Sequence, residues 1–77
     1  MQNLITAMRE TFPTLADDAL KPELRLCDCP SWDSMTAVNL LMEVEKACGV
    51  TMGSYEPTDS TTLADLAVAI AAAGGKP

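Results

Sequence analysis

Apolar side chains recur with helical spacing in three segments of the chain, and no segment shows the alternation of a half-buried strand. The first segment runs from residue 3 to residue 12 and stops before a proline, which cannot continue a helix. The second spans residues 34–48 and is followed by Gly49, a residue type that often terminates helices. The third begins near Thr62, where Thr62 and Asp65 have the spacing of a capping box.

Two long connections separate these segments. Residues 13–33 are mostly polar with scattered leucines, and because loops of this length often carry a short helical turn, we expect one at residues 15–20. Residues 50–61 contain glycine and proline, so we expect a loop there with at most one short helix near residues 56–60. The last four residues, 74–77, are expected to be frayed.

These segments predict one all-α domain over residues 1–77, a small four-helix bundle of three main helices and one short helix, with a long first loop. A chain of 77 residues makes a single domain, and its 48% hydrophobic content is too high for a disordered chain. Because the chain has only one Trp, one Tyr and one Phe, its core must be mainly aliphatic.

The charged residues limit the classes of function that this chain can have. Eleven acidic and five basic residues give a net charge of −6, which opposes binding to nucleic acid and favours docking onto basic surfaces of partner proteins. The chain has no histidine, and therefore lacks the commonest general base, so we do not expect an enzyme. The apolar stretch of residues 63–73 is far shorter than the ~20 residues of a membrane span, and no export signal is recognisable. We expect a cytoplasmic monomer with no membrane partner.

The cysteines do not indicate a metal site or a disulfide framework. Cys27 and Cys29 provide two thiols, which cannot complete a tetrahedral zinc site without histidine or a second pair of ligands. Cys48 falls on the predicted core side of the second helix, where a small buried thiol is typical. We therefore expect no bound metal.

The second predicted helix has more apolar surface than one core contact requires. At 100° per residue, one stripe faces the core: Ala37, Leu40, Val44 and Cys48. Met35, Val38 and Met42 lie on the other flank, so the apolar arc is about 240° wide, whereas a surface helix needs little more than 100°. Either the long loop covers this flank or it stays open for a partner, and flexible methionines favour a partner surface.

A possible modification site lies where the first loop meets this helix. Asp33 and Ser34 are both favoured at helix N-termini, so the pair alone is typical of an ordinary cap. Asp59 and Ser60 repeat the dipeptide before the last helix, where we expect only a turn and a cap. The following residues distinguish the two copies. Residues 33–45, Asp-Ser-Met-Thr-Ala-Val-Asn-Leu-Leu-Met-Glu-Val-Glu, resemble the modification motif of acyl carrier proteins, in which an Asp-Ser-Leu-like triplet opens the second helix.

The resemblance to acyl carrier proteins covers most of the chain. It includes the first helix, the long loop, the motif helix, its Gly-Val exit and a last helix entered through Thr-Thr-Leu at residues 61–63. It implies that Ser34, preceded by Asp33, carries a covalent 4′-phosphopantetheine arm, which a separate phosphopantetheinyl transferase donates from coenzyme A. Acyl cargo would be held on the arm as a thioester. A helix N-terminus suits the phosphodiester, because its free N–H groups and dipole favour negative charge.

The resemblance also implies a surface for partner enzymes. Acyl-loading and synthase-type enzymes would contact the apolar flank of the motif helix through Met35, Val38 and Met42. Basic patches on these enzymes would meet the carboxylates of Asp33, Glu43, Glu45 and Glu56.

Two departures from the family pattern indicate a specialised carrier, serving fatty-acid-like, polyketide or other biosynthesis. Residues 29–32, Cys-Pro-Ser-Trp, replace the usual Leu-Gly upstream of Asp-Ser. Trp32 would either pack against the loop, which we favour, or flank the arm. Thr36 and Asn39 replace frequent acids. A second interpretation stays open: a non-enzymatic helical adaptor without a prosthetic group, binding a partner helix through a Met-lined groove.

Overall fold

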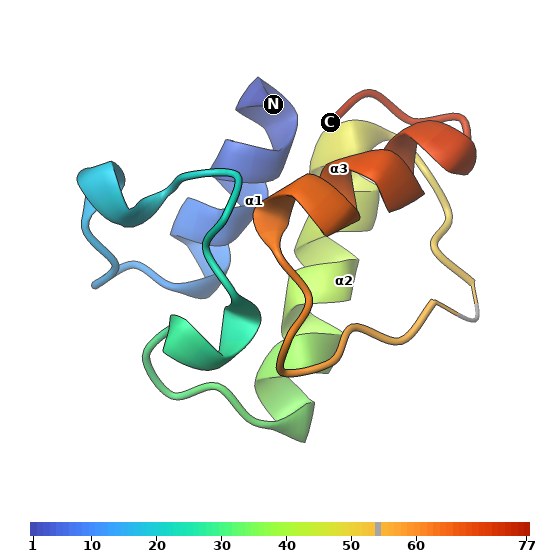
Figure 1. Cartoon of the computed structure of the whole chain (residues 1–77). Coiled ribbons are helices and arrows are strands. Elements are labelled where there is room, and N and C mark those ends of the chain that lie inside the picture. The colour runs from blue at the N-terminus through green and yellow to red at the C-terminus, as the bar shows by residue number, and fades with distance from the viewer. Residues whose placement is uncertain (54) are drawn as a thin grey trace.

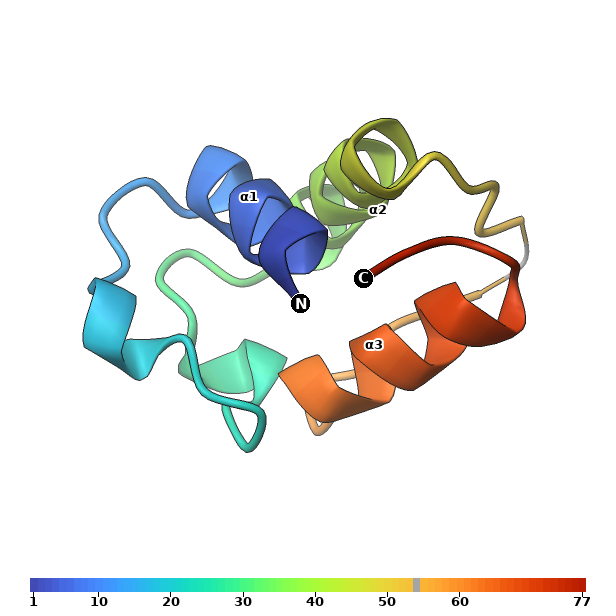
Figure 2. The ribbon, with the colours of Figure 1, turned by 90° about the horizontal axis from the view of Figure 1, so that it is seen from above.

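Three α-helices carry the fold of the computed structural model, which describes residues 1–53 and 55–77 (Figure 1). They are α1 (Gln2–Thr11), α2 (Ser34–Cys48) and α3 (Leu63–Ala72), and the first loop contains the 3₁₀ turns η1 (Asp17–Ala19) and η2 (Leu26–Asp28). Seen from above, α1 and α2 lie beside each other and α3 lies across from them (Figure 2). The described residues form no β-strand, so the all-α prediction is confirmed. None of the described helices combines the length and hydropathy needed to cross a bilayer.

The predicted limits of α2 and the start of α3 are confirmed. The helix α2 ends at Gly49, which has the left-handed conformation (φ 63°, ψ 40°) expected of a terminating glycine. At the start of α3, the Asp65 N–H donates to the Thr62 hydroxyl and the Thr62 N–H donates to the Asp65 carboxylate, each over 3.1 Å. This reciprocal pair is the capping box that the sequence predicts.

The short helix expected near residues 56–60 is not formed, and only the end of this segment makes a turn. Pro57 has no amide N–H and biases the residue before it toward an extended backbone. The Thr61 hydroxyl accepts a hydrogen bond from the Thr58 N–H over 2.9 Å, which stabilises a turn instead. Short helical structure occurs in the first loop, where η1 falls inside the predicted turn at residues 15–20.

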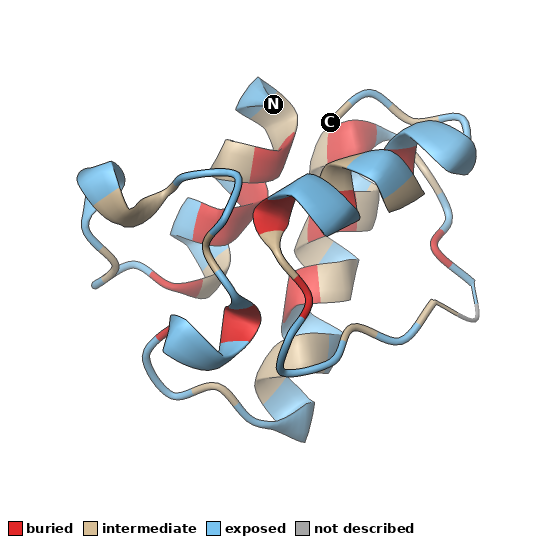
Figure 3. Cartoon of the chain, in the orientation of Figure 1, coloured by how far each residue is buried: buried red, intermediate tan, exposed pale blue. Residues whose placement is uncertain are grey.

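The core is almost entirely aliphatic, as the composition predicts (Figure 3). Its largest fully buried side chains are Leu4, Met8, Leu26, Leu40, Val44, Leu63, Leu66 and Ile70. On the predicted core stripe of α2, Leu40, Val44 and Cys48 are buried, whereas Ala37 is half-buried. The first loop takes part in the core through Leu26 of η2.

Backbone hydrogen bonds join the first loop to the segment that leads into α3. The Leu26 N–H donates to the Thr61 carbonyl over 2.9 Å, and the Leu63 N–H donates to the Leu24 carbonyl over 3.1 Å. The loop is therefore held beside the start of α3.

The C-terminal tail, expected to be frayed, instead returns along the bundle. The Gly75 N–H donates to the Ile70 carbonyl over 2.9 Å, and the Asn3 side chain donates to the Lys76 carbonyl over 3.0 Å. A Cβ at Gly75 would lie 2.7 Å from Val50 Cβ, so only glycine permits this close approach. These contacts join residues far apart in the sequence.

Candidate functional site

Ser34 is the first residue of α2, and its side chain is exposed. The preceding Asp33 caps the helix: its carboxylate accepts the Thr36 N–H over 2.7 Å, and its carbonyl accepts the Ala37 N–H over 3.0 Å. Ser31 turns the chain into the helix with a left-handed backbone (φ 59°) that non-glycine residues seldom adopt. The Ser34 hydroxyl is thus held at the positive end of the helix dipole, open to a second protein.

Because the cap of α2 is a carboxylate, the stability of the start of this helix should depend on pH. Hydrogen bonds from Thr36 lower the pKa of Asp33 below its ordinary value of 3.8. A lowered pKa means that the stabilisation is complete above the unfolded value and is lost as the pH falls through the folded value. We expect wild-type helicity to fall below pH about 4 more than that of Asp33→Asn, which caps without titrating. Far-UV circular dichroism between neutral and acid pH measures the difference, and equal acid losses in both proteins would contradict it.

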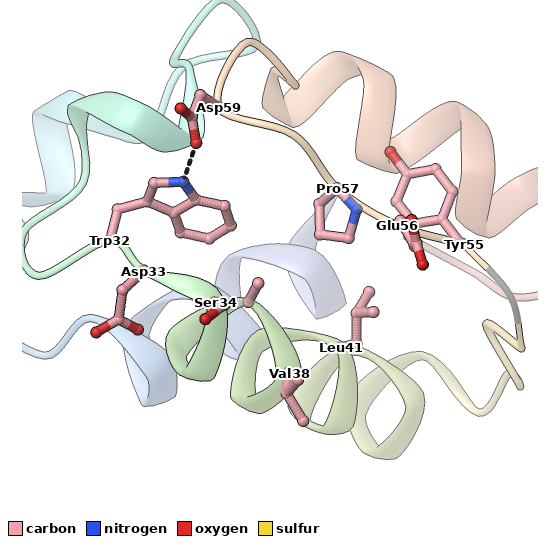
Figure 4. A pocket seen from close by; sticks show the side chains of 10 residues that line it. Trp32, Asp33, Ser34, Val38, Leu41, Tyr55, Glu56, Pro57 and Asp59 are labelled. Carbon is pink, nitrogen blue, oxygen red and sulfur yellow. Dashed lines mark hydrogen bonds between the residues drawn. The ribbon is translucent and has the colours of Figure 1, made fainter.

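An open cleft of about 510 Å³ lies next to Ser34, between the first half of α2 and the segment that follows Met52 (Figure 4). Most of its lining is apolar or aromatic: Trp32, Ala37, Val38, Leu41, Tyr55 and Pro57. The carboxylate residues Asp33, Glu56 and Asp59 complete the lining, together with Ser34 itself. The site therefore combines an exposed hydroxyl with an adjoining apolar surface.

The second apolar flank of α2 is open to solvent. Met35, Val38 and Met42 are 76%, 58% and 61% exposed. Of the two alternatives for this flank, cover by the long loop is excluded, because the first loop instead lies beside the start of α3. The three residues form an exposed apolar row that begins beside Ser34; we call it the α2 face.

The four carboxylates that the sequence places at a partner surface lie in different surroundings. Asp33 and Glu56 are exposed at the cleft, and Glu43 is half-buried on α2. Glu45 is also half-buried, but its carboxylate accepts the Met52 N–H over 2.8 Å and so holds the connection that leaves α2. The sequence interpretation placed Glu45 only at a partner surface and missed this structural contact.

Trp32 and Asp59 are further site residues that the sequence interpretation did not assign to a site. The Trp32 indole N–H donates to the Asp59 carboxylate over 2.7 Å at the end of the cleft (Figure 4). The expectation that Asp59 serves only a turn and a cap is wrong, since Thr62 caps α3 and Asp59 binds Trp32. The available signal was Trp32 itself, because a partly buried indole N–H usually finds a hydrogen-bond acceptor.

Burial shifts the pKa values of two cysteine thiols, Cys29 and Cys48. Burial, reinforced by the neighbouring Asp28 and Cys27, raises the pKa of Cys29 to about 11. Burial likewise raises the pKa of Cys48, whose predicted place in the core is confirmed. Within residues 1–53 and 55–77, no cluster of three or more His, Cys, Asp or Glu side chains is arranged to hold a metal ion.

In comparisons with known proteins, no family model, no curated protein and no solved structure matches this chain. The chemistry of the site therefore has to be argued from its own residues. Ser34 provides an exposed hydroxyl at a helix N-terminus, and the chain contains no histidine to act as its general base. The geometry leaves this hydroxyl accessible to another protein.

Proposed function

We propose that this protein is an acyl carrier protein whose Ser34 hydroxyl is the attachment point of a 4′-phosphopantetheine arm. The observation that carries the proposal is the exposed Ser34 hydroxyl at the first turn of α2, beside an open apolar cleft. The arm supplies a terminal thiol on which acyl intermediates are held as thioesters for fatty-acid-like, polyketide or other specialised biosynthesis. The resemblance of residues 33–45 to the carrier motif supports the same assignment.

The residues around Ser34 fit a phosphate-linked group. Asp33 uses its own carboxylate to cap the Thr36 N–H, while the amides of Ser34 and Met35 belong to the same positively polarised first turn. The positive end of the helix dipole at this turn would favour the negative phosphodiester, and the distal end of the arm would stay free. In this proposal, residues 55–61 take the position of the short fourth helix of a carrier bundle, and the protein is a cytoplasmic monomer without catalytic activity of its own.

We assign partner binding to the α2 face. Its apolar row lies beside the carboxylates of Glu43 and Glu56, and a net charge of −6 favours enzymes with basic docking patches. A phosphopantetheinyl transferase and the acyl-loading and synthase-type enzymes would use this same surface in turn. Because Glu45 already binds Met52, we give it a smaller part in docking than Glu43 and Glu56.

The direct test of the proposal is intact-mass measurement after incubation with coenzyme A and a broad-specificity phosphopantetheinyl transferase. We expect the protein to gain the mass of one arm. If no arm is gained, the exposed α2 face favours the adaptor interpretation, in which a partner helix binds the row of methionines without any prosthetic group.

If partner enzymes dock on the α2 face, a charge introduced there should slow these enzymes, whereas a charge introduced on another exposed surface should not. Met42→Glu places a carboxylate in the apolar row, so we expect kcat/KM of an acyl-loading enzyme acting on the carrier with its arm attached but not yet acylated to fall about tenfold. Stability should change little, because Met42 is 61% exposed. Val68→Glu is the matched control, since Val68 is 70% exposed but lies on α3. Equal losses in both variants would exclude docking through the α2 face.

A further inference from the structure

Trp32 and Asp59 are joined across the end of the cleft beside Ser34 (Figure 4). The Nε1···Oδ1 distance is 2.7 Å, and the two residues are 27 positions apart in the sequence. Hydrogen bonds to a carboxylate are shorter and stronger than neutral ones. The indole also lies against Phe12, a core residue, with ring centroids 6.5 Å apart and planes tilted by 44°. Trp32 is therefore held on one side by the core and on the other by Asp59.

Residues 55–59 form the cleft wall that faces α2. On one side of the cleft, the Glu45 carboxylate accepts the Met52 N–H over 2.8 Å, which fixes the connection where it leaves α2. On the other side, the Trp32–Asp59 hydrogen bond fixes the end of the wall. Between these two points, no hydrogen bond joins the described residues of the wall to α2. The Asp59 end is also held through its backbone, because the Cys27 N–H donates to the Asp59 carbonyl over 3.0 Å. The Trp32–Asp59 bond adds a side-chain contact between this end of the wall and the residue before the α2 cap.

We propose that Trp32 and Asp59 are positioning residues for the modification of Ser34. Their hydrogen bond joins the Asp59 end of the cleft wall to Trp32, the residue that leads directly into the Asp33 cap beside Ser34. When the bond is lost, the Cys27–Asp59 backbone bond still holds the wall to the first loop, but Trp32 and the start of α2 lose an anchor. The Ser34 hydroxyl then takes a wider range of positions when a transferase binds, and misplacement of a reacting group slows the transfer. This inference rests on the proposed function.

The test compares transferase kinetics on variants that remove either partner of the bond. Trp32→Phe keeps a ring against Phe12 but removes the donor, and Asp59→Ala removes the acceptor. We expect each to lower kcat/KM for modification of Ser34 about tenfold, the scale of one hydrogen bond. The double variant should be no slower than either single variant, because both substitutions remove the same interaction.

Two controls separate the hydrogen bond from the charge. Asp59→Asn loses the charge but keeps an oxygen that accepts the indole N–H, so it should be modified nearly as fast as the wild type. Asp18→Ala removes an exposed carboxylate on η1, outside the cleft, and should match the wild type. If Trp32→Phe fails to fold, the Asp59→Ala and Asp59→Asn pair carries the test.

Fluorescence provides a readout that does not depend on modification. Trp32 is the only tryptophan, so the tryptophan emission of the unmodified protein reports on the surroundings of this one indole. Asp59→Ala should shift the emission and Asp59→Asn should not. A shifted emission with wild-type kinetics would overturn the positioning role and leave the carrier proposal intact, as would additive losses in the double variant. If the wild type itself is never modified, the carrier proposal fails, and this inference fails with it.

Discussion

Ser34→Ala is expected to abolish attachment of the arm completely. The linkage needs a hydroxyl oxygen at this position, and alanine provides none. The fold should be unaffected, because Ser34 is exposed and the cap of α2 comes from the Asp33 carboxylate. We therefore expect intact-mass spectra without any added arm, together with wild-type helicity and a Tm close to that of the wild type.

The chain contains its own matched control for this result. Ser60, like Ser34, is exposed and preceded by Asp, but it lies before α3 and its hydroxyl lies 3.2 Å from the Thr58 hydroxyl. Ser60→Ala should be modified as the wild type is. An arm found on Ser34→Ala would show that the attachment point is another residue. If Ser60→Ala lost the arm while Ser34→Ala kept it, the attachment point would be Ser60, and the proposal would have named the wrong Asp-Ser pair.

Features set by neighbouring residues could be predicted from the sequence. The limits of α2 follow from Asp33 and Gly49, and the start of α3 follows from Thr62 and Asp65, each a contact within a few positions. The apolar flank of α2 follows from helical spacing, but spacing alone left open whether the first loop covers it. The place of Ser34 at the start of α2 follows from where the helix begins, whereas its choice as the candidate hydroxyl came from the resemblance of residues 33–45 to the carrier motif.

Contacts between distant residues could not be predicted from one sequence. Trp32 and Asp59 are 27 positions apart, and the hydrogen bond from Asn3 to Lys76 spans 73 positions. Such pairings depend on how the loops fold over the helices, which hydrophobic periodicity does not encode. The absent helix at residues 56–60 has a local origin instead, because Pro57 favours an extended backbone before it and the Thr58–Thr61 hydrogen bond stabilises a turn.

Leu40→Ala is expected to destabilise the protein severely, while Met42→Ala, only two residues further along α2, is not. Leu40 is fully buried, and truncating a buried leucine costs about 2–5 kcal/mol in lost burial and cavity formation. A domain of 77 residues has a free energy of unfolding of roughly 4–12 kcal/mol, so this loss is a large part of the total. Met42 is 61% exposed, and its truncation should change the free energy of unfolding by only about 0.5 kcal/mol or less.

Urea unfolding followed by circular dichroism, with Trp32 fluorescence as a second probe, measures both variants. The midpoint should fall for Leu40→Ala, with a slope near that of the wild type, and should hardly move for Met42→Ala. Enzyme kinetics should show the opposite order once corrected for the folded fraction, because Met42 belongs to the α2 face and Leu40 does not. Equal destabilisation by the two substitutions would mean that α2 does not turn its Leu40 side to the core and its Met42 side to solvent as described. The separation of these effects on one helix is what distinguishes a docking surface from ordinary core packing.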